Sequence, residues 1–208
     1  MNEAYKMKLH NNLEFKNFVK ITEDVDNIYL TTQEIDCLYN LNLSGTQAGV
    51  RDLFLIGCYT AMRFGDYSRL TKYDITDGLI RLKQAKTSNN VVIPVHPRLC
   101  EIINRWDGAP KVSQQKFNLI IKIICRLADI TEMVAIGWEK TTRYEEKCEL
   151  VSSHTARRSA AINMFKAGIP TISIMKITGH KTESNFMKYI KISKEENARL
   201  LADNEFFK

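Results

Sequence analysis

The side chains best suited to phosphate chemistry lie in one stretch of fewer than forty residues, from Ser152 to Tyr189. His154 and Arg157 are three residues apart and directly follow two serines. A helix that begins at these serines would present both side chains on one face of its first turn. Because the N-terminus of a helix attracts anions, this arrangement favours the binding of a phosphate group.

The second half of the stretch holds a histidine and a tyrosine. Residues 171–178 fit a short helix, and Gly179 suits the left-handed conformation that commonly closes a helix. His180 would then lie in the turn beyond this helix, and Tyr189 follows nine residues later. Near a phosphate, an imidazole could carry a proton and a phenol could act as a nucleophile.

The composition is that of an ordinary globular protein. The chain has 208 residues, 44% of them hydrophobic and 26% charged, which suffices for one large domain or two small ones. The formal net charge of +6 and the pI near 9.0 favour a polyanionic partner. A soluble enzyme could also carry this excess without binding nucleic acid.

The cysteines and the apolar segments indicate a soluble cytoplasmic protein. The cysteines are widely spread, odd in number and without the paired spacing of a metal site: Cys37, Cys58, Cys100, Cys125 and Cys148. Such a set suits a reducing compartment better than secretion. No apolar run approaches the roughly twenty residues that span a bilayer, and the N-terminus lacks the apolar core of a signal peptide.

Elements upstream must bring further cations to this stretch. Thr31 is followed three residues later by a glutamate, a capping-box signature that predicts the start of a helix. From Val50 to Ala61, apolar residues at spacings of three and four predict a buried helix. Arg63 would leave the end of that helix.

Turn residues between β-type runs begin at residue 72 and predict three short antiparallel strands, with Lys86 at the TSNN tip. Two amphipathic helices should follow, one opened by Pro97 and one over residues 113–130. Residues 131–150 lack a clean period and are interpreted as a surface excursion with some strand. The expected fold class is mainly α with a small three-stranded antiparallel β-sheet.

Five motifs in this order resemble the catalytic domain of the tyrosine recombinase, or phage integrase, family. They are TAMRFGDYSRL around Arg63, QAKTSNNVVIPV around Lys86, SSHTARR at His154 and Arg157, TGHK at His180, and NFMKYI at Tyr189. Each motif alone is weakly specific, but five in family order make a specific signal. The resemblance covers residues 28–208 and is most similar in detail to integrases of mobile elements in Bacteroides-type bacteria.

The resemblance implies an enzyme that cleaves and rejoins DNA by transesterification, for site-specific recombination or integration. Tyr189 would attack a phosphodiester and form a 3′-phosphotyrosine intermediate. Arg63 and Arg157 would bind the non-bridging oxygens, where planar guanidinium groups suit the developing charge. No cofactor and no metal are implied.

The remaining catalytic roles follow from the same resemblance. Lys86 would protonate the leaving 5′ oxygen, His154 would accept or return the tyrosine proton, and His180 would hydrogen-bond the phosphate. Asp66 resembles the acidic residue that aims the first arginine. Beside these positions, two further cations are expected to contact flanking DNA phosphates, although surface solubility explains them nearly as well: Arg158 and Lys181.

The resemblance also divides the chain. Residues 1–27 would be a linker or the tail of a missing N-terminal DNA-binding domain, and residues 28–192 the catalytic domain. Residues 193–208 would form a C-terminal helix that packs on another subunit. Double-stranded DNA and further recombinase subunits, in a DNA-bound tetramer, are the expected partners, and the bacterial nucleoid is the expected location.

Other interpretations remain for the same residues. An isolated Arg63 and Asp66 would more often be a surface ion pair, and Lys86 a solvated lysine in a turn. The segment ISIMKITGHKTESNFMKYI also resembles a helix-turn-helix, so a DNA-binding regulator without catalysis is one alternative. A type IB topoisomerase, which shares the nucleophilic chemistry without partner exchange, is another.

Overall fold

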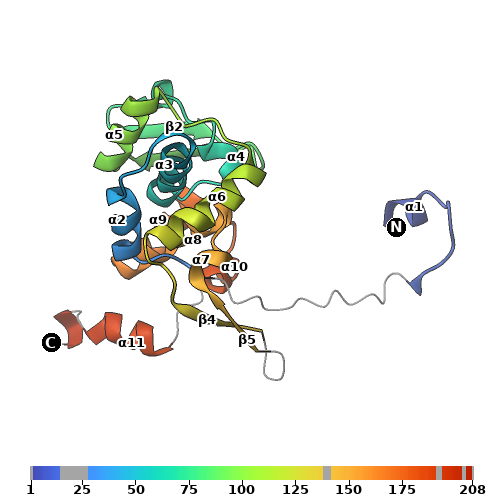
Figure 1. Ribbon diagram of the computed structural model, residues 1–208. Coiled ribbons are helices and arrows are strands. Elements are labelled where there is room, and N and C mark those ends of the chain that lie inside the picture. The colour runs from blue at the N-terminus through green and yellow to red at the C-terminus, as the bar shows by residue number, and fades with distance from the viewer. Residues whose placement is uncertain (1, 15–27, 138–141, 191–193, 203–204, 208) are drawn as a thin grey trace.

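Helix α3 (Gly45–Thr60) runs through the middle of the protein and is buried on nearly all sides. In the computed structural model, residues 2–14, 28–137, 142–190, 194–202 and 205–207 are described. Figure 1 shows most helices gathered around α3, with the first and last helices of the chain lying outside this body. The interior of the protein is therefore built around a single helix.

The structure confirms a mainly helical fold with a small three-stranded antiparallel sheet. The other helices are α1 (Asn2–Lys6), α2 (Thr32–Asn40), α4 (Phe64–Tyr67), α5 (Pro97–Trp106), α6 (Gln114–Leu127), α7 (Lys147–Leu150), α8 (Ser153–Lys166), α9 (Thr171–Thr178), α10 (Glu183–Ile190) and α11 (Lys194–Ala202), with 3₁₀ turns at Lys72–Asp74 and Glu205–Phe207. No helix in this described part of the chain has the length and apolarity that crossing a bilayer requires.

The predicted sheet consists of β1 (Ile75–Thr76), β2 (Leu79–Lys83) and β3 (Asn90–Pro94), paired in the order β1-β2-β3. Ile80 lies opposite Ile93, and both side chains are buried. The described residues of the segment 131–150, predicted as a surface excursion, form a second antiparallel pair, β4 (Met133–Ile136) and β5 (Arg143–Glu146), followed by α7. The sequence shows no clear apolar repeat here because none of the residues in these two strands is fully buried.

The helix boundaries follow the local signals in the sequence. Thr31 and Glu34 form the predicted capping box at the start of α2, each side chain accepting a hydrogen bond from the other's backbone N–H. Pro97 opens α5, as predicted. Helix α9 ends at Gly179, whose φ of 72° is the left-handed conformation expected there.

A buried polar network ties α3 to its neighbours. Arg51 donates hydrogen bonds to three carbonyl oxygens at the C-terminal end of α2 and pairs with Asp52 at 2.6 Å. Asp52 also accepts hydrogen bonds of 2.7 Å from Arg105 and Trp106 of α5. Because each buried charge has partners, the network fixes α2 and α5 on α3 without leaving an unpaired ion.

Helix α8, which carries the predicted histidine and arginines, packs closely on α3. A Cβ added at Gly57 would lie 2.8 Å from the Cβ of Ala156 and 2.8 Å from the ring of Tyr67, so only glycine fits this contact. The Tyr67 hydroxyl donates a hydrogen bond of 3.3 Å to the carbonyl of Ser153 at the start of α8. The end of α3 and the first turn of α8 are thereby held side by side.

Parts of the predicted domain division fall outside the described residues. Residues 15–27 of the expected linker are among them, as are positions 193, 203–204 and 208 of the expected C-terminal tail. Two elements of these segments are described: α1 near the N-terminus and α11 near the C-terminus, both apart from the main body in Figure 1. The boundaries at residues 27 and 192 remain predictions.

Gly57→Ala should lower the free energy of unfolding by about 1–2 kcal/mol, because overpacking between α3 and α8 outweighs the gain in helix propensity. Gly49→Ala in the same helix is the matched control. Its added Cβ would meet Pro110 and Trp106 at an ordinary 3.6 Å, so this variant should be neutral or more stable. Urea denaturation of both variants measures the difference, and equal stabilities would contradict the close packing.

Candidate active site

The structure brings five of the six predicted catalytic residues together. The ring of Tyr189 lies 5.6 Å from that of His154 and 5.0 Å from that of His180, measured between centroids. The charges of Arg63 and Arg157 both act on the Tyr189 hydroxyl. Residues from α8, α10, the turn after α9 and the start of α4 therefore converge, although about 125 residues separate the first from the last along the chain.

Arg157 is the most firmly held member of this cluster. Its side chain is 2% exposed, and it donates one hydrogen bond of 2.8 Å to the carbonyl of Ala61 and another to the carbonyl of Thr178. These carbonyls belong to the C-terminal ends of α3 and α9, where the helix dipoles favour a cation. Two of its five N–H donors are used in this way, which fixes the plane of the guanidinium group.

Arg63 lies at the start of α4, directly after the buried end of α3, and is half-buried. Its Nη1 donates a hydrogen bond of 3.3 Å to Oε1 of Gln84. This contact joins the helical part of the site to the β2–β3 hairpin.

Gln84 is a site residue that sequence reasoning missed. It is 1% exposed, and its Oε1 also accepts a hydrogen bond of 2.7 Å from Thr87 in the hairpin turn. A Cβ added at Gly179 would lie 2.7 Å from that same oxygen, so the amide fills the space beside the turn that carries His180. The strand alternation could have indicated it, because Gln84 follows the inward-facing Ile80 at a period of two.

Asp66 was predicted to aim Arg63, and the structure shows it bonded to other groups. It forms no hydrogen bond with Arg63. Its buried carboxylate accepts a hydrogen bond of 2.8 Å from the N–H of Ala85 and pairs with Arg69 at 3.1 Å. The short helix α4 directs this side chain to the end of β2. Asp66 therefore supports the base of the hairpin that carries Lys86.

Lys86 lies in the predicted turn at the tip of the β2–β3 hairpin and is exposed. Among the described residues it has no ion pair, and the structure does not bring it into contact with the cluster. A long, flexible side chain on a hairpin tip has the reach that a proton donor to a bound substrate needs. Its catalytic role stays a prediction.

Both histidines of the cluster are neutral at pH 7. His154 is exposed over part of its surface, but desolvation of its imidazole within the site, reinforced by the neighbouring guanidinium groups, lowers its pKa to about 4. Burial and the same positive surroundings lower the pKa of His180 to about 4. The Nδ1 of His180 lies 2.8 Å from the hydroxyl of Thr178, which orients its ring. Neutral imidazoles can accept a proton, as the predicted role of His154 requires.

Tyr189 is held by its own short helix. Phe186 and Ile190 of α10 are buried in a small apolar cluster with α8 and α9, which gives the eight-residue α10 the tertiary support that it needs. The Tyr189 hydroxyl is buried with no hydrogen bond of ordinary geometry to a described residue. Burial raises the pKa of Tyr189, and the charges of Arg157 and Arg158 act in the opposite direction. The phenol is therefore protonated at neutral pH.

The two cations predicted to contact flanking DNA differ in exposure. Lys181 is exposed, as a phosphate contact requires, and its role stays a prediction. Arg158 is only 8% exposed, and its guanidinium carbon lies 5.0 Å from the centre of the Tyr189 ring. Its direction along α8 takes it into the site and away from the surface. A contact between Arg158 and a flanking phosphate does not fit this position.

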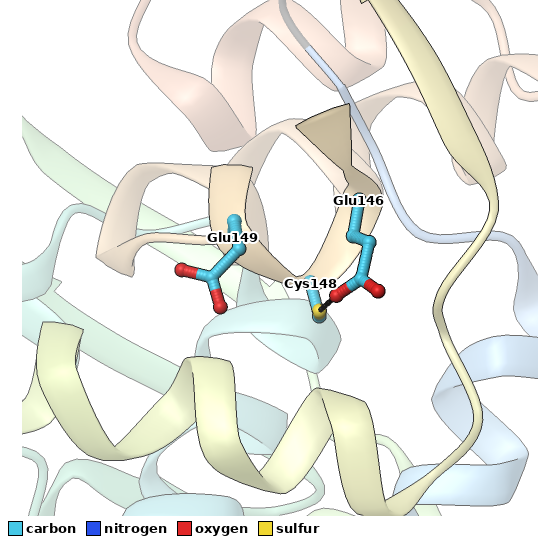
Figure 2. A group of neighbouring side chains, drawn as sticks. All are labelled: Glu146, Cys148 and Glu149. Carbon is cyan, nitrogen blue, oxygen red and sulfur yellow. Dashed lines mark hydrogen bonds between the residues drawn. The ribbon is translucent and has the colours of Figure 1, made fainter. Parts of the chain in front are cut away.

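A second group of ionisable side chains lies between α6 and α7, where Figure 2 shows the carboxylate of Glu146 directed toward Cys148 and Glu149 beside them. The carboxylates already have cationic partners. Arg126 of α6 pairs with both glutamates, and Lys122 lies 3.7 Å from Glu149. The group is an ion-pair contact between two helices, and nothing in it requires a metal.

The geometry of the main cluster fits nucleophilic attack on a phosphate ester. A phenol beside two fixed guanidinium groups can attack such an ester while the cations stabilise the charge that develops. A mainly helical fold with this arrangement is what the sequence motifs predict for the catalytic domain of a tyrosine recombinase. The chain belongs to the phage integrase family, whose model matches residues 28–196.

Solved structures with similar folds come from the same class, at low sequence identity. A lambda integrase (75-356) dimer bound to a COC' core site has a TM-score of 0.68 and 16% identity, covering 91% of this chain and 68% of that one. XerA recombinase has a TM-score of 0.60, 14% identity, and coverage of 97% and 72%. The Tn1549 transposon integrase (aa 82-397) with circular intermediate DNA has a TM-score of 0.58, 15% identity, and coverage of 95% and 73%. Comparison with curated protein sequences gives no match.

Gln84→Met should loosen the hairpin tip, because it keeps the length of the side chain and removes the acceptor for Arg63 and Thr87. We expect faster hydrogen exchange of the backbone amides at residues 85–89, by several-fold, measured by mass spectrometry. Lys83→Met, an exposed change on the adjoining strand, is the control and should leave these rates unchanged. Unaltered exchange in Gln84→Met would contradict the bridging role.

The lowered pKa values of His154 and His180 predict a loss of stability in mild acid. The unfolded chain takes up protons at these residues near pH 6.5, but the folded protein takes them up only near pH 4. The contribution is complete above about pH 6.5, and the free energy of unfolding should fall as the pH is lowered toward 5. The double variant His154→Gln, His180→Gln should show a shallower fall in urea denaturation. Imidazole NMR signals that titrate at pH 6.5 would contradict the assignment.

Proposed function

We propose that this chain cleaves and rejoins double-stranded DNA as a site-specific recombinase, through a covalent 3′-phosphotyrosine intermediate at Tyr189. Its membership of the phage integrase family supports the class of reaction. The position of the Tyr189 hydroxyl, buried beside the fixed guanidinium of Arg157 and between two neutral imidazoles, carries the assignment of the nucleophile.

The reaction balances with the residues at hand. The Tyr189 oxygen forms a bond to phosphorus, the bond from phosphorus to the 5′ oxygen breaks, and the phenol proton passes to His154. Lys86, brought to the DNA on its hairpin, gives a proton to the leaving 5′ oxygen. Arg63 and Arg157 stabilise the charge on the non-bridging oxygens. Re-ligation runs the same steps in reverse, and because the phosphotyrosine ester preserves the phosphodiester bond, no ATP is consumed.

The position of Tyr189 also favours cleavage by the subunit that carries it. Its ring packs against His154 and His180 of the same chain, and α10 is anchored by buried apolar residues of α8 and α9. A tyrosine donated to a neighbouring subunit would first have to leave these contacts. We infer that each subunit cleaves with its own tyrosine.

Double-stranded DNA and further subunits are the partners we propose. The lambda integrase structures with similar folds are described as a dimer bound to a core site and a tetramer bound to a Holliday junction. In this chain, α11 lies apart from the main body in Figure 1, and Leu201, Phe206 and Phe207 near it are exposed. These apolar side chains would suit packing on a neighbouring subunit within a DNA-bound tetramer.

The biological setting is proposed from the sequence motifs. Their likeness to integrases of Bacteroides-type mobile elements favours integration or excision of such an element. The enzyme would then act on DNA in the nucleoid of a bacterial cell. A helix-turn-helix regulator without catalysis is a poor alternative, because it gives no reason for Arg63, from a distant segment, to lie at the same site as Tyr189.

Tyr189→Phe should abolish the covalent adduct between protein and DNA. A nicked DNA substrate that traps cleavage, incubated with the wild-type chain, should give a slowly migrating band on a denaturing gel. Tyr144→Phe is the matched control, since this tyrosine is 66% exposed on β5 and should form the adduct normally. Adduct formation by Tyr189→Phe, or none by the wild type, would refute the assignment.

A second assay separates the recombinase from a topoisomerase. Two DNAs that carry the recombination site should exchange strands in the presence of the wild-type chain, with recombinant junctions detected by sequencing. A topoisomerase would relax supercoils without joining the two DNAs. A DNA-binding regulator would yield neither product.

A further inference from the structure

Arg158 is a buried cation without a partner of opposite charge. It is 8% exposed, and its Nε is buried with no hydrogen-bond partner. Across the described ranges, no carboxylate forms an ion pair with it. Its neighbour Arg157, in contrast, is held by two backbone carbonyls. The two adjacent arginines of α8 therefore stand in different electrostatic situations.

An unpaired guanidinium group in such a position is costly, since burial removes the water that would solvate it. Burial lowers the pKa of Arg158 accordingly, and the one neighbouring group that acts in the opposite direction is Tyr189. A fold retains such a charge at least cost when an anion forms beside it. The Arg158 guanidinium carbon lies 5.0 Å from the ring centre of Tyr189, so the group best placed to become that anion is the tyrosine itself.

We propose that Arg158 is the positioning residue of the nucleophile: it stacks on the Tyr189 ring and supplies the positive charge that balances the phenolate during attack. This inference rests on the proposed function of Tyr189 and assigns Arg158 a place in it. The stacking also limits the orientations that the Tyr189 ring can adopt. Arg158 acts on the phosphate through the tyrosine and makes no contact with flanking DNA.

The other charged or titratable groups that face Tyr189 cannot take this role. The set comprises Arg63, His154, Arg157 and His180. The histidines are neutral at pH 7, and the two arginines are the predicted ligands of the phosphate oxygens. Among the described residues, Arg158 is thus the cation beside the phenol that has no other anion or carbonyl to bind.

The first test measures the phenol directly, without DNA. A 3,5-difluorotyrosine placed at position 189 of the whole chain reports its ionisation through the fluorine NMR shift as pH is varied, and fluorination brings the titration into a range where the protein is folded. Arg158→Gln should raise this pKa relative to the unsubstituted chain, and Arg158→Lys, which keeps the charge, should raise it less. An unchanged pKa in Arg158→Gln would overturn the proposal.

The second test separates an action on Tyr189 from an action on DNA. With the nicked substrate at saturating concentration, Arg158→Gln should form the adduct at least ten-fold more slowly at pH 7. Its DNA affinity and the salt dependence of that affinity should stay within two-fold of wild type. Lys181→Gln is the comparison: if it contacts a phosphate, its affinity and salt slope should fall. A lost salt slope in Arg158→Gln would place this residue on the DNA and refute the proposal.

Fluorination supplies a readout that a purely structural role would not affect. In Arg158→Gln, replacing Tyr189 by difluorotyrosine should restore a larger share of the cleavage rate than the same replacement does in the unsubstituted chain, because the less basic phenol needs less charge balance. Equal effects in both backgrounds would contradict the proposal. Thermal unfolding checks that Arg158→Gln is folded. If it is not, the same measurements on Arg158→Lys decide whether the proposal holds, and an unchanged Tyr189 pKa in that variant would overturn it.

The two proposals fail in different ways. If the unsubstituted chain forms no adduct, the proposed function is wrong, and the fluorine titration still decides whether Arg158 acts on the phenol. If the unsubstituted chain forms the adduct and Arg158→Gln forms it at an equal rate, the function stands and the inference is wrong.

Discussion

The candidate site depends on the hydrogen bonds that the buried side chain of Arg157 forms with two backbone carbonyls. It extends from α8 and donates to the last carbonyls of α3 and α9, so one buried guanidinium group joins the ends of three helices. A charge this deeply buried is tolerated only when its donors are satisfied. The helices must therefore meet at this point, and their meeting brings Arg63, His180 and Tyr189 around the same space.

The sheet enters the site through side chains that are not themselves catalytic. Gln84 accepts from Arg63 and Thr87, and Asp66 accepts from the backbone of Ala85. These contacts hold the base of the β2–β3 hairpin while leaving Lys86 at its tip in solvent. A fixed base and a free tip suit a residue that must meet a substrate before it can act.

Without DNA, the candidate nucleophile and both histidines of the site are uncharged. Burial keeps the phenol of Tyr189 protonated and, together with the arginines, keeps His154 and His180 neutral. The positive charge of the arginines is then not balanced by an anion until a DNA phosphate binds. Binding of that phosphate would offset the arginines and make protonation of an imidazole easier, since a nearby anion raises the pKa of histidine. The site is in this way prepared to release the phenol proton when its substrate binds.

The sequence was sufficient to predict the fold class, many helix ends and a set of candidate catalytic residues, because capping boxes, glycine stops and apolar periods are local signals and the five motifs keep their order. It could not determine contacts between distant segments. It did not single out Gln84, and it could not show that Asp66 accepts a hydrogen bond from the backbone of Ala85 or that Arg158 packs on the ring of Tyr189. Each of these depends on which helix or strand packs opposite, since burial and hydrogen-bond partners across tens of residues are set by tertiary packing, and only the folded chain decided them.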